Sequence, residues 1–405
     1  MTAQGRTAVA VLATVFLFNL LGRGSGETYA VFLLPLEREF GWARSQLTSV
    51  YSMYLLVGAF MAPLAGTLFD RFGPRVTYSG GLLCLSAAFF LASSLGNLWE
   101  FYLFVGVMIG VGVGLVGMVP ASALLTRWFR VRLSTAIGIA FSAAGMGGLV
   151  FVPLSQWLIQ LLDWRTTYQI LAGVLLLGVP VAALGVPWRK FTLGLQDSVA
   201  TREGRVAGQG WTARAALGSR MYWALTQVFF FTATAMFTVL VQLVVFLIDL
   251  GISPLAAASA YGVIGMLSVV SVSMSGLLCE RFGFRQVVSA SFAGTASGVV
   301  VLAALSYWPS AALLVVFVAV FGLCMGVRGP VVSAIATRKF AGPKVATIYG
   351  MIYAANAIGA AFGSLMGGVL HDLSGGYRAG FALSLCAVGL AVAPFWTVKE
   401  LRNFR

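Results

Sequence analysis

The chain alternates between long apolar runs and short stretches that hold most of its charged residues. Each run is close to the ~20 residues that an α-helix needs to cross a hydrocarbon core of ~30 Å. A helix satisfies its own backbone hydrogen bonds, which lipid cannot do. The pattern therefore predicts an all-α polytopic membrane protein with twelve transmembrane helices. The predicted spans cover about residues 8–33, 45–67, 76–96, 100–125, 133–157, 166–187, 221–248, 254–279, 286–307, 310–336, 344–370 and 379–398.

The composition supports this interpretation and excludes several classes of protein. Of the 405 residues, 60% are hydrophobic and 9% are charged, whereas an ordinary soluble domain carries about 25% charged residues. The single histidine, His371, excludes a metal site built from several histidines. No Walker motif and no set of nucleophile, base and acid is found. We therefore expect no catalytic residue, no cofactor and no metal.

The net charge of +14 is concentrated on one set of predicted loops. The opposite loops hold only Arg38, Arg44, Arg165 and Arg378 among the basic residues. The positive-inside rule then predicts that both termini are cytoplasmic. We expect a bacterial-type inner (plasma) membrane and interpret the basic excess as a topology signal. A nucleic-acid partner is not expected.

The chain contains an internal repeat. Residues 188–220 interrupt the apolar pattern and predict a cytoplasmic linker between two six-helix bundles, 1–187 and 221–405. The run GTLFDRFGPR at 66–75 returns as GLLCERFGFR at 276–285, 210 residues later. Duplicated bundles related by an axis along the membrane normal can rock about a central site, which is alternating access.

The repeated run places charges at the predicted cytoplasmic rim of each half. Its first glycine allows close approach of helices, and its acidic and basic side chains can pair across the interface between the halves and with helix ends. Such a cluster would hold an inner gate in one state and release it in the other. The predicted gating residues are Asp70, Arg71, Arg75, Glu280, Arg281 and Arg285.

These repeats resemble the major facilitator superfamily over essentially the whole chain, which implies the major facilitator fold. The runs GETYAVF at 26–32 and PLEREFGWARSQ at 35–46 are similar to the monocarboxylate porter and oxalate:formate antiporter branch. That branch implies a carboxylate substrate, moved with a proton or exchanged for another anion.

The chain departs from this branch at three places. Monocarboxylate porters carry a lysine where this chain has Glu27, and an acid and an arginine in span 8. Here the sequence AAASAYGVIGMLSVVSVSMSGLL in span 8 has no charge. The oxalate exchanger type has a lysine in span 11, and here residues 348–356 have no cation. These departures indicate that the anion site of that branch is rebuilt or absent in this chain.

Arg328 is a candidate anchor for an anionic substrate. It lies in predicted span 10, and its repeat mate is Met118. A charge at membrane depth is costly and marks a functional site by default, and a guanidinium binds carboxylates bidentately. The alternative is a structural role, in which Arg328 pairs with a carbonyl freed by Pro330 or with Glu27.

Arg23 and Glu27 are one helical turn apart in span 1 and share a face. Glu27 could carry a coupling proton or contact a polar substrate, with Arg23 tuning it. The alternative is a self-neutralising pair. Further candidate contacts are polar side chains on otherwise apolar helices, where hydrogen bonding between helices is the alternative role. They are Tyr54, Gln227, Tyr349, Tyr353 and Asn356.

The sequence thus predicts a secondary active transporter for a small organic solute. A carboxylate anion is the first expectation, with proton coupling or exchange. A larger neutral or amphoteric metabolite, such as a riboflavin-like vitamin or a nucleoside, and drug efflux are the alternatives. The partners expected are the small-molecule substrate, the lipid bilayer and coupling protons, with a functional monomer.

Overall fold

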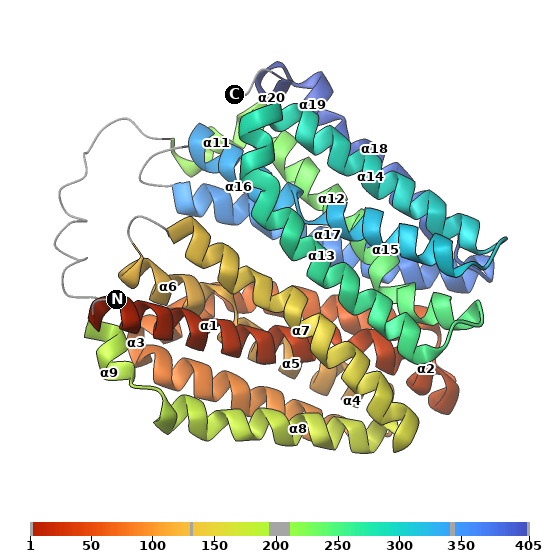
Figure 1. Cartoon of the computed structure of the whole chain (residues 1–405), viewed down its shortest axis with the longest axis horizontal. Helices are drawn as coiled ribbons and strands as arrows, with labels where there is room; N and C mark the ends of the chain where they lie inside the picture. The colour runs from red at the N-terminus through yellow and green to blue at the C-terminus, as the bar shows by residue number, and fades with distance from the viewer. Residues whose placement is uncertain (1–2, 130–132, 194–210, 341–344, 403–405) are drawn as a thin grey trace. The chain divides into compact units, whose positions relative to one another are not determined.

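The computed structural model describes residues 3–129, 133–193, 211–340 and 345–402 (Figure 1). In these ranges the secondary structure is helical, without strands. Eleven helical segments of the described chain are long and apolar enough to cross a membrane. Most of the predicted linker, residues 194–210, lies outside the described residues.

The chain groups into two compact units, the first from residues 1–32 and 53–207 and the second from residues 33–52 and 208–405. The second unit thus includes a segment, 33–52, that the sequence-based division assigns to the first bundle. That division stays a prediction.

Unit 1 contains α1 and most of α3, followed by the helices up to residue 193. Two of its segments, η1 and η2, are π-helical turns within longer spans. Its elements are α1 (Ala3–Glu27), α3 (Arg44–Ala92, from residue 53), α4 (Leu98–Phe101), η1 (Tyr102–Met108), α5 (Ile109–Val116), α6 (Met118–Trp128), α7 (Leu133–Leu161), α8 (Trp164–Pro180), η2 (Val181–Gly185) and α9 (Trp188–Leu193).

Unit 2 contains most of α2, the start of α3 and the helices of the second half. The elements are α2 (Tyr29–Phe40, from residue 33), α11 (Ala213–Leu217), α12 (Arg220–Asp249), α13 (Pro254–Phe282), α14 (Phe284–Leu305), α15 (Ala311–Met325), α16 (Arg328–Lys339), α17 (Val345–Ser374), α18 (Arg378–Val392), α19 (Pro394–Thr397) and α20 (Lys399–Arg402).

The repeated run forms the same turn in both halves. Gly73 (φ 78°) and Gly283 (φ 82°) both adopt the left-handed region, which favours glycine because it has no Cβ. Gly283 separates α13 from α14, and Gly73 breaks the geometry inside α3. Two predicted spans, 45–67 and 76–96, lie on either side of Gly73. The eleven segments include Pro63–Ala92 but none over residues 44–61, and this accounts for the difference from the twelve predicted spans.

A second paired feature interrupts the fourth span of each half. A proline lacks an N–H, and its ring clashes with the carbonyl four residues earlier. For Pro120 that residue is Val116, where α5 ends, and for Pro330 it is Gly326, directly after α15. The sequence therefore sets both interruptions, and the second one makes Arg328 the first residue of a new helix.

Close glycine contacts hold one helix pair in each unit. In unit 1, α1 and α7 lie side by side (Figure 1), and a Cβ added at Gly147 would lie 2.6 Å from Cα of Gly24. In unit 2, α12 and α17 form the corresponding pair. There the hydroxyl of Thr238 donates to the carbonyl of Gly363 across 3.0 Å. Small residues let the backbones approach, and the hydroxyl adds a bond between helices.

The α1–α7 contact predicts a sharp difference between two neighbouring glycines. Gly147→Ala should lower stability by about 1–3 kcal/mol, because the methyl group meets backbone that cannot move aside. Gly148→Ala is the matched control, since an added Cβ meets nothing within 4 Å. Thermal unfolding of both purified variants measures the difference. Equal melting temperatures would contradict the close contact.

Candidate functional site

Arg328 begins α16 and is fully buried in unit 2. Its Nη2 donates a hydrogen bond of 2.9 Å to Oγ1 of Thr295 on α14. Its guanidinium carbon lies 4.8 Å from the centre of the Phe292 ring. Its Nε and Nη1 have no hydrogen-bond partner among the described residues. Because a buried cation with unmet donors is costly, these two nitrogens favour an anion.

The backbone before Arg328 is held by neighbouring helices. A Cβ added at Gly326 would overlap with the carbonyl oxygen of Ser268 and the hydroxyl of Ser271, both on α13. Ser291 of α14 donates a hydrogen bond of 2.6 Å to the carbonyl of Cys324. These contacts hold the backbone between α15 and α16 in place. They therefore define the position from which the Arg328 side chain extends.

In unit 1 the structure brings Arg23, Glu27 and Tyr54 together. Glu27 is the last residue of α1, and both it and Arg23 are half-buried. Both act electrostatically on Tyr54, which is buried. Gly26 allows this approach, because a Cβ there would lie 2.5 Å from the Tyr54 hydroxyl. A carboxylate, a guanidinium and a phenol therefore share one region near the end of α1.

Tyr349, Tyr353 and Asn356 recur along α17 and form a polar stripe on this helix. The hydroxyls of Tyr349 and Ser333 of α16 share a hydrogen bond of 2.6 Å. Tyr353 is 45% exposed and meets the ring of Phe229 edge-on, with the ring centres 5.8 Å apart. Asn356 is half-buried on the same helix. The stripe thus presents one bonded hydroxyl, one accessible phenol and one amide.

Gln227 makes a contact between helices. Its Nε2 donates a hydrogen bond of 2.9 Å to the carbonyl of Leu390 on α18. That bond occupies one of the two N–H donors of the amide, and the role of Gln227 as a substrate contact stays a prediction.

The predicted gating residues lie at the turns made by Gly73 and Gly283. Arg71 lies over the ring of Phe72 at 5.3 Å, and Arg281 repeats this contact with Phe282 at 5.4 Å. The guanidinium carbon of Arg285 lies 3.7 Å from the centre of the Trp396 ring. The other three predicted gating residues, Asp70, Arg75 and Glu280, are exposed. The carboxylates of Asp70 and Glu280 form no ion pair with a described residue of their own units. The side chains are therefore accessible for pairing elsewhere.

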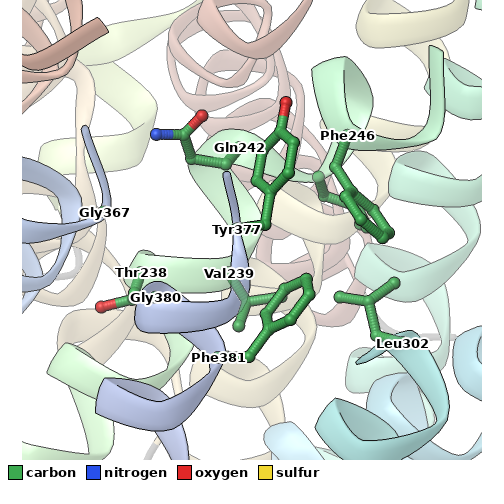
Figure 2. Close-up of a pocket in the computed structure, with 10 residues that line it drawn as sticks. Thr238, Val239, Gln242, Phe246, Leu302, Gly367, Tyr377, Gly380 and Phe381 are labelled. Carbon is green, nitrogen blue, oxygen red and sulfur yellow. The ribbon is translucent and has the colours of Figure 1, made fainter. Parts of the chain in front are cut away.

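Figure 2 shows a small cavity in unit 2 beside Gln242, Tyr377 and Phe381. It leaves about 10 Å³ for the centres of water molecules, which is enough for one water and too little for a metabolite. The Gln242 side chain is buried, and both of its amide atoms lack a partner among the described residues. We interpret the cavity as a place for an ordered water.

Unit 2 also contains a polar network centred on Arg44, which the sequence pattern did not predict. Glu37, Asp249, Asp372 and Tyr377 surround this residue. One signal was present in the sequence: predicted spans 1, 7 and 11 all have an acidic residue near the same predicted end. Spans of the same direction bring such residues to one side of a bundle, but only the fold selects which of them meet.

Comparisons with known proteins identify the family. A sequence model of the Major Facilitator Superfamily matches residues 12–279 and 249–403. Monocarboxylate transporter 13 of Bos taurus is 26% identical over 377 residues, which cover 92% of this chain and 85% of that protein. Monocarboxylate transporter 3 of Rattus norvegicus is 27% identical over 396 residues, with coverages of 95% and 79%.

A solved structure shares the fold. The crystal structure of a bacterial homologue of the human lysosomal transporter Spinster, inward-facing and unoccupied, has a TM-score of 0.66 and 15% identity. The match covers 97% of this chain and 94% of the chain in that structure. This identity supports the fold alone. The predicted all-helical membrane fold and the resemblance to the monocarboxylate porter branch are both confirmed. The chain is an integral membrane protein and belongs to the Major Facilitator Superfamily, a family of transporters and not of enzymes.

Proposed function

We propose that this chain moves a small carboxylate across the membrane by alternating access, with a proton or in exchange for another anion. The observation that carries the proposal is the fully buried guanidinium of Arg328, whose Nε and Nη1 have no partner among the described residues. The names of the similar monocarboxylate transporters support the same substrate class.

A carboxylate can supply the hydrogen-bond acceptors that Nε and Nη1 of Arg328 lack among the described residues. It offers two acceptor oxygens to the planar donors of a guanidinium, and it neutralises the charge. Thr295 already positions Nη2, so the other two nitrogens remain for the ligand. Because Arg328 has no exposed surface, the contact between α14 and α16 must loosen before a carboxylate enters. The site is therefore closed in this conformation and opens in another.

The group around Glu27 supplies a route for coupling. A carboxylate can take up and release one proton, and Tyr54 interacts electrostatically with both Glu27 and Arg23. We assign Glu27 the coupling proton, with Arg23 and Tyr54 as its partners. Tyr349, Tyr353, Asn356 and Gln227 are the proposed polar contacts of the substrate. Asp70, Arg71, Arg75, Glu280, Arg281 and Arg285 are the proposed gating residues.

We propose the predicted orientation for this chain, with both termini in the cytoplasm and a bacterial-type inner (plasma) membrane as the site. Support comes from the distribution of lysine and arginine over the loops. A functional monomer is proposed because one chain holds both six-helix halves.

A larger neutral or amphoteric metabolite is the second candidate substrate. The apolar part of α13 has no charged residue, and α17 has no lysine or arginine. The accessible ring of Tyr353 beside Phe229 offers an aromatic surface on which a flat ring can stack. Drug efflux is the third candidate, with no observation that favours it.

The carboxylate proposal predicts ligand-dependent stabilisation. A carboxylate at about 100 times its Kd should raise the stability of the native protein by ~2.7 kcal/mol, and Arg328→Met should abolish the effect. Arg378→Gln, at an exposed arginine, should keep it. Thermal-shift assays against monocarboxylates, vitamins and cationic drugs measure this. Equal shifts in all three proteins, produced by a neutral ring compound, would favour the second candidate.

Proton coupling predicts a separable defect at Glu27. Glu27→Gln keeps the size of the side chain but carries no proton, so accumulation driven by a pH gradient should fall at least tenfold while exchange across the membrane continues. Glu100→Gln is the control, because a glutamine preserves the cap that Glu100 forms with Gly96. Uptake and counterflow in vesicles measure the two activities. Undiminished gradient-driven uptake in Glu27→Gln would remove this residue from coupling.

A further inference from the structure

Two side chains of α14 hold the guanidinium of Arg328 inside unit 2. Oγ1 of Thr295 accepts a hydrogen bond of 2.9 Å from Nη2, and the centre of the Phe292 ring lies 4.8 Å from the guanidinium carbon. Thr295 and Phe292 are both buried. A hydroxyl oxygen and the face of an aromatic ring both attract a cation. Thr295 and Phe292 therefore form a docking site for Arg328.

The docking site attracts a cation but repels an anion. The Thr295 hydroxyl carries one hydrogen, which it donates to the carbonyl of Ser291, one turn earlier, at 3.1 Å. The lone pairs of Oγ1 are left to face Arg328. The face of the Phe292 ring also carries negative charge density. A carboxylate therefore cannot bind Arg328 from the side of α14, and it has to take the guanidinium away from the docking site.

Neighbouring contacts keep the docking site itself in place. Helices α14 and α15 lie side by side, and a Cβ added at Gly294 would overlap with Sγ of Cys324. Ser291 also donates a hydrogen bond of 2.6 Å to the carbonyl of Cys324. Because interiors packed this closely move as units, α14 and α15 act as one wall. Release from the docking site is therefore a movement of the arginine and not of the wall.

The backbone next to Arg328 has room for such a movement. A Cβ added at Gly326 would overlap with the carbonyl oxygen of Ser268 on α13, so the chain is held up to this residue. At Gly329, an added Cβ would meet nothing within 4 Å. The change from held to open backbone thus falls at the start of α16, where Arg328 is the first helical residue.

The docked arginine is only partly satisfied, so a better acceptor can displace the docking site. Nε and Nη1 of Arg328 have no hydrogen-bond partner among the described residues, and the side chain has no exposed surface. Buried donors without a partner cost free energy. A carboxylate brings an opposite charge and two acceptor oxygens, whereas Thr295 brings one neutral oxygen. The exchange of the docking site for a carboxylate is therefore favourable.

We propose that Thr295 and Phe292 are an internal competitor of the substrate, which holds Arg328 when no carboxylate is bound and gives it up when one binds. This inference deepens the proposed function and rests on it. When only a fraction of a protein can bind, its apparent Kd is the intrinsic Kd divided by that fraction. A weaker docking site should therefore tighten carboxylate binding. A residue that positions Arg328 for the substrate would have the opposite effect.

The first measurement is the rate at which phenylglyoxal, an arginine reagent, modifies Arg328 in the purified full chain. Mass spectrometry of the peptide that contains residue 328 gives this rate. Thr295→Val keeps the shape of the side chain but removes the acceptor, so Arg328 should react at least fivefold faster. Phe292→Leu should also speed the reaction, because it removes the aromatic face.

Two control variants isolate the docking contact. Thr295→Ser keeps the hydroxyl and should react at the native rate. Thr226→Val removes a hydroxyl of α12 that bonds to the carbonyl of Tyr222 on its own helix, and it should also leave the rate unchanged. A faster rate in Thr226→Val would show that loss of any hydroxyl loosens the protein, and it would overturn the assignment to Thr295.

The second measurement is the protection of Arg328 by acetate, a simple carboxylate probe. Bound acetate occupies the guanidinium and should slow its modification. Half-protection of Thr295→Val should need at least threefold less acetate than half-protection of the native protein. A higher acetate requirement in Thr295→Val would make Thr295 a positioning residue and overturn the internal competitor.

The two measurements separate this inference from the proposed function. Unchanged or slower modification in both Thr295→Val and Phe292→Leu overturns the internal competitor, even where acetate protects Arg328. Faster modification without protection by acetate or larger monocarboxylates supports the docking of Arg328, whereas the proposed carboxylate function fails. If Thr295→Val does not fold, as size-exclusion chromatography would show, Phe292→Leu decides alone.

Discussion

A polar group inside a lipid bilayer has no water to bond with, and this constraint shapes every part of the protein. Backbone groups meet it by forming helices. Hydroxyl groups meet it by bonding to carbonyls four residues earlier, as Thr238 does with Thr234, and then to a neighbouring helix. Arg328 is one of several described side chains that do not meet it fully, because Thr295 satisfies only part of its guanidinium. Because Nε and Nη1 of this buried cation have no hydrogen-bond partner among the described residues, Arg328 is the strongest candidate for a functional residue.

The same local physics operates twice along the chain. Glycine in the left-handed region turns the backbone at residues 73 and 283, and proline interrupts the fourth span at residues 120 and 330. The halves differ at the position two residues before that proline, where one has Met118 and the other has Arg328. A shared architecture thus carries different chemistry in its two copies.

The packing of unit 2 combines two kinds of contact with different consequences. Helices α12 and α17 meet through glycines and hydroxyls that leave no room for water or larger side chains. The Arg44 network instead joins its elements through charges that water can solvate. The first contact excludes water, and the second keeps its acidic side chains within reach of water.

The sequence by itself determined the helical membrane fold, the repeat and the positions of its breaks, because span length, glycine and proline act locally. It also indicated Arg328 and Glu27, because a charge in an apolar run is visible without a structure. Only the tertiary structure decided that Arg328 meets Thr295, that Tyr54 lies beside Glu27, and that Arg44 gathers Glu37, Asp249 and Tyr377. These residues are far apart in the chain or on separate helices, and which side chains meet is set by the packing of whole helices, which no local pattern records.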